Sequence, residues 1–376
     1  MGTTTRAAVL WGYGEDWKIE DVELDDPKAN DVLVSIKAAG LCHSDDHAHT
    51  GDLPLPVPLI GGHEGAGVVE AVGPDVRDLA PGDHVAVSFI PACGKCRWCS
   101  TGRQYLCDSG AKLFDIGMMS DGRVAHHVTR ADGSREPVGR YAQAGTFSEK
   151  ILVNEDSLVK VDPDLPFDVV ALTSCGVATG FGSATERAGT VPGDNVVVVG
   201  IGGIGINAVQ GAKIAGAQRV IAVDPVEMKR EQAMAFGATH TYASMEEAAE
   251  AVRDMTEGIM AERVILAPGV VHGDMIQPAM DLTAKGGTLV VTGLAPAMES
   301  DVQLNLMMLS MSNKEIKGTI FGSQNPRDQI PRLLSMYRQG VLRLDELVTR
   351  RYTLDEVNQG YEDMLAGRNI RGVIEF

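Results

Sequence analysis

The feature that most constrains the fold of this chain is a glycine-rich turn between a buried strand and a helix. Four consecutive valines, Val196 to Val199, are typical of a strand buried on both faces of a parallel sheet. The turn Gly200 to Gly205 follows directly and fits G-x-G-x-x-G. An alanine-rich helical segment and a second strand ending at Asp224 complete a βαβ unit. This order predicts a dinucleotide-binding domain, although the glycine pattern alone would be weak evidence.

The same unit indicates how a nucleotide would be held. Gly202 would let the main chain approach the pyrophosphate, whose charge the N-terminus of the helix would receive. Asp224 would bond the ribose hydroxyls and repel a 2′-phosphate, which favours NAD. Lys229 and Arg230 follow closely and could soften that repulsion, so NADP stays open. The residues expected at the nucleotide are Gly200, Gly202, Gly203, Ile204, Gly205, Asp224 and Lys229.

The N-terminal third has a different pattern from the nucleotide-binding part. Short segments rich in Val, Ile and Leu alternate with turns rich in Gly, Pro and Asp, which is typical of a barrel-like β domain. The expected fold class is therefore α/β, with a doubly wound parallel sheet and a separate β-rich domain. We expect domains at 1–180 and 181–321, with residues 322–376 returning to the first domain.

Charge excludes several classes of partner. The chain has 33 basic and 51 acidic residues, a net charge of −18, which opposes binding to nucleic acid or to an anionic membrane. Residues 1–17 lack the long uncharged core of a signal peptide, and no stretch approaches the roughly 18 apolar residues of a membrane span. We therefore expect a cytoplasmic protein.

Four of the six cysteines are crowded into residues 93–107 with the spacing C-x2-C-x2-C-x7-C. Four thiolates at such a spacing predict a closed structural zinc site, formed by Cys93, Cys96, Cys99 and Cys107. An iron–sulfur cluster also takes four thiolates, but the ferredoxin run ends in a shorter spacing and a proline. Reduced thiols without metal remain possible for this group.

Three further stretches carry side chains that could take part in a reaction. Residues 39–47 place Cys42 among polar residues with no amphipathic period, which indicates a loop or helix start directed at a site. His63 and Glu64 lie side by side among glycines and small residues, either as a surface pair at a chain corner or as a used polar pair. Cys175 lies far downstream in an apolar, helix-like segment, 166–177, and alone would be an inert small hydrophobe.

Residues 108–146 show no periodicity, and we expect a long loop that forms an entrance to the site. The segment contains Met118-Met119 and His126-His127. Two adjacent histidines with no third partner are expected to lie on the surface rather than to bind metal.

Taken together, these motifs resemble the zinc-dependent medium-chain alcohol dehydrogenase family over essentially the whole chain. The resemblance implies a GroES-like catalytic domain with a zinc-stabilised lobe beside the Rossmann domain, and a homo-oligomer. The residues that carry it are Gly40 to Asp45, Gly62 to Gly65, Cys93 through Cys107, Cys175-Gly176, Gly200 to Gly205, and Ile370-Arg371.

The resemblance implies a role for each matching residue. Cys42, His63 and Cys175 would bind a catalytic zinc and leave a fourth position for water or substrate, with Glu64 behind the metal. Ser44 would take the alcohol proton and His47 would pass it to solvent. The further residues implied at the cofactor are His43, Thr179, Thr292, Leu294 and Arg371, and those implied in the substrate pocket are Leu53, Phe89, Thr179 and Leu294.

The implied reaction interconverts an alcohol with its aldehyde or ketone by hydride transfer to NAD, aided by zinc as a Lewis acid. A primary, fairly apolar alcohol is favoured. Two zinc ions per chain are expected. The runs Cys99 to Cys107, Gly145 to Ser148 and Gly205 to Ala212 also resemble a bacterial branch that keeps NAD tightly bound and is assayed with nitrosodimethylaniline. A thiol-dependent formaldehyde dehydrogenase and a non-enzymatic zinc- and nucleotide-binding sensor also remain open from the sequence.

Overall fold

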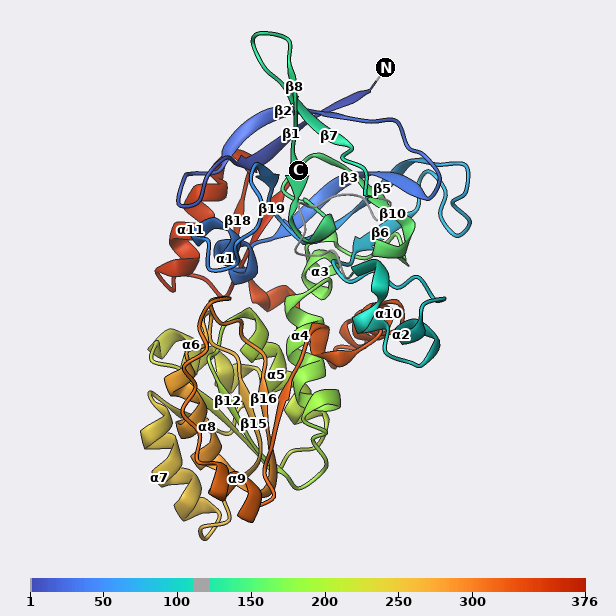
Figure 1. Ribbon diagram of the computed structural model, residues 1–376. Helices are drawn as coiled ribbons and strands as arrows, with labels where there is room; N and C mark the ends of the chain where they lie inside the picture. Colours follow the sequence, from blue (N-terminus) through green and yellow to red (C-terminus); the bar gives the residue numbers. More distant parts are fainter. Residues whose placement is uncertain (1, 111–121) are drawn as a thin grey trace. The chain divides into compact units, whose positions relative to one another are not determined.

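The computed structural model describes residues 2–110 and 122–376, and its contacts divide the chain into two compact units (Figure 1). The first unit comprises Met1–Cys175, Asn325–Gln339 and Leu344–Phe376, and the second comprises Gly176–Gln324 and Gly340–Arg343. The expected domain boundaries at 180 and 321 remain a prediction of where the domains separate.

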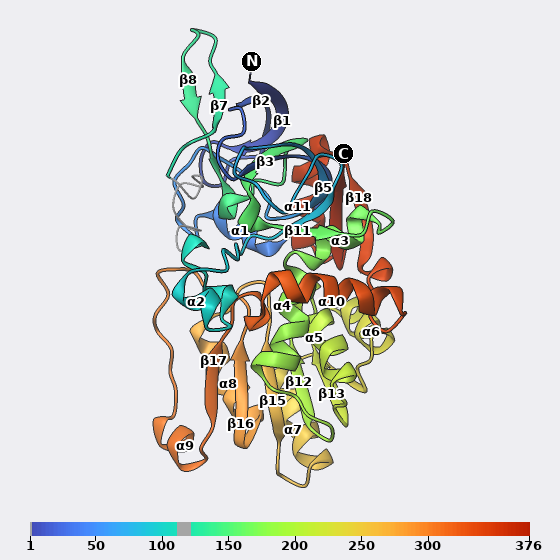
Figure 2. The same cartoon turned by 90° about the vertical axis from the view of Figure 1, so that its right-hand side faces the viewer.

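The second unit contains a parallel sheet with the strand order β14-β13-β12-β15-β16-β17. Helices cover both faces of this sheet (Figure 2), so the predicted doubly wound α/β class is confirmed. The strands are β12 (Asn195–Val199), β13 (Arg219–Val223), β14 (His240–Tyr242), β15 (Ala261–Leu266), β16 (Thr283–Val291) and β17 (Glu315–Gly318). The helices are α4 (Gly176–Gly182), a π-helix (Ser183–Arg187), α5 (Gly203–Ile214), α6 (Glu227–Ala235), α7 (Met245–Met255), α8 (Ile276–Leu282) and α9 (Leu306–Met311).

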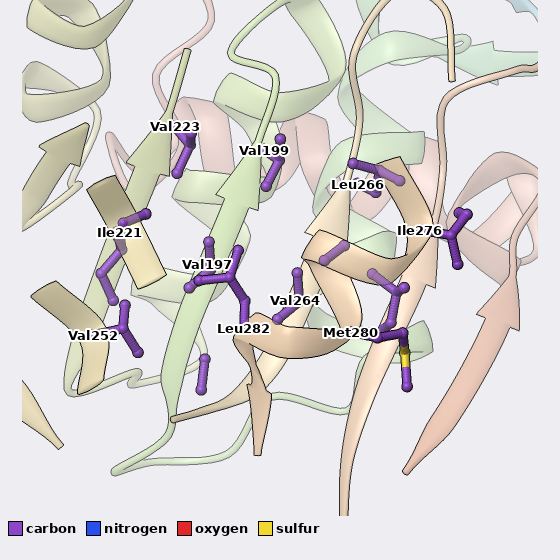
Figure 3. Packing of buried hydrophobic residues seen from close by; sticks show 14 of the residues in the cluster. Val197, Val199, Ile221, Val223, Val252, Val264, Leu266, Ile276, Met280 and Leu282 are labelled. Carbon is purple, nitrogen blue, oxygen red and sulfur yellow. The ribbon is translucent and has the colours of Figure 1, made fainter. Parts of the chain in front are cut away.

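The core of the second unit lies between the sheet and its helices. Val197 from β12, Val264 from β15 and Leu282 from α8 are fully buried and lie in one cluster (Figure 3). The valine run of β12 is buried along its whole length, as the sequence predicts for a strand with neighbours on both faces.

The first unit is built on two sheets with mostly antiparallel pairing. One sheet has the order β8-β7-β2-β1-β4-β9, and the other has the order β11-β6-β5-β3-β19-β18 with β10 paired to β3. The strands of the first sheet are β1 (Thr3–Leu10), β2 (Lys18–Leu24), β4 (Leu59–Ile60), β7 (His126–Thr129), β8 (Arg135–Pro137) and β9 (Gly139–Arg140). Those of the second are β3 (Asp31–Gly40), β5 (Glu64–Val72), β6 (His84–Val87), β10 (Lys150–Asn154), β11 (Leu158–Val161), β18 (Val348–Tyr352) and β19 (Arg371–Glu375).

Short helices occupy the connections of the first unit. They are α1 (His43–Thr50), α2 (Arg97–Ser100), α3 (Phe167–Thr173), α10 (Pro326–Arg338) and α11 (Val357–Leu365). The helix expected over 166–177 is interrupted, because α3 ends at Thr173 and α4 begins at Gly176. Cys175 therefore lies in a break between two helices rather than within one.

The prediction of a structureless loop over 108–146 is wrong for its second half. Strands β7 and β8 form an antiparallel hairpin, and β7 extends the first sheet by pairing with β2 (Figure 1). These strands are three or four residues long, too short to show a period of two in the sequence. His126 is buried in this hairpin, contrary to the expected surface position, while Met118-Met119 lies outside the described residues.

Among the described residues, no single helix is long and apolar enough to cross a membrane. One bent pair, Phe167–Thr173 with Gly176–Arg187, passes by length and composition only.

Candidate metal and nucleotide sites

The register of three strands brings the reactive stretches of the first unit to one end of a sheet. Gly40, the last residue of β3, pairs with Glu64, the first residue of β5. On the other side of β3, Gly40 pairs with Val373 of β19, which begins at Arg371. Cys42 follows β3 by two residues and His63 precedes β5 by one, so residues far apart in sequence meet at this end.

The resulting cluster can hold a metal ion. One ligand atom from each of Cys42, His63, Glu64 and Cys175 lies within 4.8 Å of the others, and all four residues are buried. Both ring nitrogens of His63 are buried without a hydrogen-bond partner among the described residues, and Nδ1 lies beside an aspartate carboxylate. A buried imidazole nitrogen without a hydrogen-bond partner destabilises the fold unless a ligand or a metal ion binds it. Two cysteines and a histidine are a donor set that fits zinc.

The charge state of the cluster suits a cation. A hydrogen bond from the Cys175 thiol outweighs burial and, with the charge of His63, holds the pKa of Cys42 well below its usual value. Burial alone would lower the pKa of His63, but the charges of Asp45 and Cys42 raise it well above its usual value. The lowered pKa of Cys42 favours a thiolate, and a bound cation would compete with the proton of His63.

Asp45 is the main residue of this site that the sequence did not reveal as functional. It is fully buried, its Oδ2 lies 3.0 Å from Nδ1 of His63, and its Oδ1 accepts a 2.8 Å hydrogen bond from the backbone N–H of Gly62. A carboxylate beside Nδ1 can orient the ring and leave Nε2 for a metal ion. The available signal was an aspartate in the first turn of a helix that starts beside Cys42.

Glu64 and Arg371 form a buried ion pair. The family resemblance implied separate roles for them, behind the metal and at a phosphate, whereas the structure joins their side chains. A Cβ on Gly40 would collide with the Glu64 carboxylate and approach the Arg371 guanidinium. Glycine at position 40 therefore leaves the space that the ion pair occupies.

The residues expected to move the proton lie on α1, beside the cluster. The Ser44 hydroxyl lies 3.7 Å from Sγ of Cys42. His47 is buried and its Nδ1 lies 3.4 Å from the carboxylate of the partly exposed Asp52, while its ring contacts that of His43. Phe89, expected in the pocket, packs its ring edge to face against His63 at 5.3 Å, and Leu53 donates its N–H to the His47 carbonyl.

The four cysteines of the second cluster also converge. Sγ of Cys93 lies 4.0 Å from Sγ of Cys99, and Sγ of Cys96 lies 3.9 Å from Sγ of Cys107. Backbone N–H groups of Cys96 and Cys99 donate to the sulfurs of Cys93 and Cys96 at 3.4 Å, which stabilises thiolates. The arrangement fits a four-sulfur metal site, as the spacing predicted, and none of the six cysteines forms a disulfide.

The glycine turn of the second unit leaves space for a nucleotide. Gly200 has φ +86°, and a Cβ on Gly205 would collide with the Gly200 carbonyl, so both glycines are needed for the turn itself. A Cβ on Gly202 would meet nothing within 4 Å, and Gly202 caps α5 without a side-chain hydrogen bond. The open N-terminus of this helix therefore fits a pyrophosphate.

Asp224 is held in place by the backbone of the turn. Its Oδ2 accepts a 2.8 Å hydrogen bond from the N–H of Ile201, and its Oδ1 accepts one of 2.9 Å from Val226. The carboxylate thus lies directly against the glycine turn, at the end of β13. Of the other residues expected at the cofactor, Thr292 and Thr179 are buried, Lys229 is half-buried and Leu294 is exposed.

A dinucleotide fold in one unit and two cysteine-based metal clusters in the other define the class of a metal-dependent oxidoreductase. Two family models match this chain, the alcohol dehydrogenase GroES-like domain over residues 28–163 and the zinc-binding dehydrogenase over residues 203–339. The chain therefore belongs to the zinc-dependent medium-chain alcohol dehydrogenase family, whose members use zinc and a nicotinamide cofactor.

Individual relatives agree with this assignment. Alcohol dehydrogenase B of Mycobacterium tuberculosis is 47% identical over 373 residues, covering 99% of this chain and 98% of the relative. The NDMA-dependent alcohol dehydrogenase of Amycolatopsis methanolica is 50% identical over 370 residues, with 98% of each chain covered. The crystal structure of benzyl alcohol dehydrogenase from Acinetobacter calcoaceticus matches with a TM-score of 0.90 and 31% identity, covering 100% of this chain and 99% of that chain. This chain is thus an oxidoreductase with the predicted two-domain fold.

Replacing Asp45 tests how the metal cluster is organised. In Asp45→Asn, an NH2 group replaces either the oxygen that accepts the Gly62 hydrogen bond or the oxygen that lies 3.0 Å from Nδ1 of His63. We expect zinc affinity at this cluster to fall about 10- to 100-fold, measured by competition with a chelator. Asp46→Asn is the matched control, because Asp46 lies near His49 and outside the cluster. Equal zinc retention by both variants would contradict the orienting role.

Proposed function

We propose that this chain interconverts a primary, fairly apolar alcohol and its aldehyde, with NAD as the hydride acceptor and two zinc ions per chain. The observation that carries this function is the buried convergence of Cys42, His63 and Cys175 beside the Ser44 hydroxyl. The similarity to alcohol dehydrogenases over nearly the whole chain supports it.

Each expected group has residues that fit it. Cys42, His63 and Cys175 would hold the catalytic zinc, while Cys93, Cys96, Cys99 and Cys107 would hold the structural one. Arg371 engages the Glu64 carboxylate, which favours Glu64 as a neighbour of the metal rather than a ligand. When bound, zinc supplies Lewis acidity and the nicotinamide accepts hydride.

The chain itself would handle the alcohol proton. Ser44 would accept it, and His47 would carry it toward Asp52, whose side chain is 36% exposed. The proposed substrate-pocket residues are Leu53, Phe89, Thr179 and Leu294. The proposed nucleotide contacts are His43, Thr179, Gly200, Gly202, Gly203, Ile204, Gly205, Asp224, Lys229, Thr292, Leu294 and Arg371.

The orientation of Asp224 supports NAD over NADP. Both carboxylate oxygens accept backbone hydrogen bonds, which keep the negative charge at the end of β13. A 2′-phosphate placed there would meet that charge.

A second form of the function keeps NAD bound through many turnovers. The 50% identity to an NDMA-dependent alcohol dehydrogenase supports it, together with the similar runs at 99–107, 145–148 and 205–212. In that form the cofactor would be reoxidised in place by a separate electron acceptor.

We also propose that the chain associates with a second copy through β17. This strand is an edge of its sheet among the described residues (Figure 2). The preceding helix, α9, exposes Leu306, Met307 and Met311. Antiparallel pairing of two β17 strands about Ile316 would set Glu315 opposite the partner copy's lysine at position 317, twice. An exposed edge beside apolar side chains is otherwise prone to aggregation.

All six cysteines lie in two groups that could hold a metal ion and none forms a disulfide, which supports a reducing compartment and hence the cytoplasm.

Ser44→Ala tests the proton step. We expect kcat for alcohol oxidation to fall about 100-fold or more, the range of a lost general acid–base group. Zinc content and NAD affinity should be unchanged, because the hydroxyl is neither a proposed zinc ligand nor a proposed nucleotide contact. The comparison is steady-state turnover of benzyl alcohol alongside metal analysis, with Ser109→Ala as control, and undiminished turnover would refute the role of Ser44.

Denaturing the purified protein tests whether NAD stays bound. If NAD acts as a retained group, the supernatant should contain about one NAD(H) per chain, measured enzymatically, and turnover with NDMA should need no added NAD. If the purified protein contains no nucleotide and is active only with added NAD, the retained form is contradicted and NAD exchanges in each turnover.

Charge reversal tests the β17 interface. Lys317→Glu would set like charges opposite each other and should shift the assembly toward monomers in light scattering, most strongly at low salt. The double variant Glu315→Lys with Lys317→Glu restores opposite charges and should recover association. If the single variant associates as well as the parent, this strand is not the interface.

A further inference from the structure

We propose that Tyr141 is a positioning residue for the reaction, and that its hydroxyl holds the backbone of Ser44 in place. This inference rests on the proposed proton-accepting role of Ser44. Tyr141 is buried, and its hydroxyl donates a 2.6 Å hydrogen bond to the Ser44 carbonyl. Its ring also lies edge to face against His63, with 5.3 Å between centroids. One side chain thus touches both the metal cluster and the backbone of the proton acceptor.

Helix α1 needs such an anchor because it is weakly defined by its own sequence. It spans eight residues, and its N-cap, Cys42, makes no side-chain capping hydrogen bond. Helices this short are marginal without tertiary contacts. Tyr361 donates a longer, 3.5 Å hydrogen bond to the Cys42 carbonyl, so the Tyr141 bond is the shorter of two tyrosine contacts on this stretch.

The turn that presents Tyr141 is strained. Ala142 and Gln143 have φ values of +50° and +60°, in the left-handed region that side chains disfavour. The buried Arg140 guanidinium holds the turn by donating from one nitrogen to the carbonyls of Gln143, at 2.8 Å, and Leu152, at 2.7 Å. Strain of this kind persists only where surrounding contacts enforce it, and such turns cluster at functional sites. In this chain, Tyr141 is the side chain that the strained turn positions.

Tyr141→Phe separates the two contacts, because it removes the hydroxyl and keeps the ring against His63. We expect kcat for benzyl alcohol to fall about 3- to 10-fold, the rate equivalent of one net hydrogen bond, with zinc content unchanged. Amide hydrogen exchange in a peptide covering residues 41–50 should accelerate. This second readout needs neither substrate nor turnover.

Tyr352→Phe is the matched control. Tyr352 is also a buried tyrosine of the first unit, but its hydroxyl donates to Asp363. We expect it to leave both kcat and exchange in residues 41–50 as in the parent. If both variants change these readouts equally, the effect is general loosening, and the positioning role is overturned.

A double-mutant cycle with Ser44→Ala completes the test. If Tyr141 acts through Ser44, adding Tyr141→Phe to Ser44→Ala should cost no further kcat, whereas independent effects would multiply and refute the inference. If the parent enzyme oxidises no alcohol, that result would contradict the proposed function rather than the positioning role of Tyr141. In that event unchanged exchange in Tyr141→Phe would separately overturn the anchoring contact.

Discussion

The antiparallel register of β3 against β5 and β19 is the constraint on which the site depends. It pairs Gly40 with Glu64 on one side and with Val373, two residues after Arg371, on the other, and the Glu64–Arg371 ion pair fills the space a Cβ on Gly40 would need. Removing one partner of such a buried pair typically costs about 3–5 kcal/mol, because the other charge stays behind. The same register sets Cys42 and His63 at the strand ends. The strand register that forms the buried ion pair therefore also brings the candidate metal ligands together.

Burial gives the cluster its chemical character. Cys42, His63, Asp45 and Glu64 are all excluded from solvent, so each charge is expensive unless another compensates it. Asp45 compensates His63, Arg371 compensates Glu64, and the hydrogen bond from Cys175 stabilises the Cys42 thiolate. A divalent cation completes this balance better than a proton, because it can bind both thiols and the remaining imidazole nitrogen at once.

The sequence predicted those parts of the structure that are encoded by short-range sequence patterns. The valine run, the glycine turn and the cysteine spacing led to the parallel sheet, the nucleotide unit and the four-sulfur cluster, and the family resemblance supplied the first metal cluster. The sequence did not predict the contacts of Asp45, the pairing of Glu64 with Arg371 or the anchoring by Tyr141. These contacts depend on the register of the strands and on turns that lie far away in the chain. The hairpin over β7 and β8 was missed since its strands gain stability from β2 rather than from their own alternation.

The central claim is that Cys42, His63 and Cys175 bind zinc while Arg371 holds Glu64 away from it. Diffraction from crystals of the purified protein, with anomalous data at the zinc absorption edge, tests it most directly. The account predicts two zinc peaks per chain. One should lie about 2.3 Å from the sulfurs of Cys42 and Cys175 and about 2.0–2.1 Å from a nitrogen of His63, and the other should lie among the four sulfurs of residues 93–107. A peak bonded to the Glu64 carboxylate, or no peak at Cys42, would contradict the account.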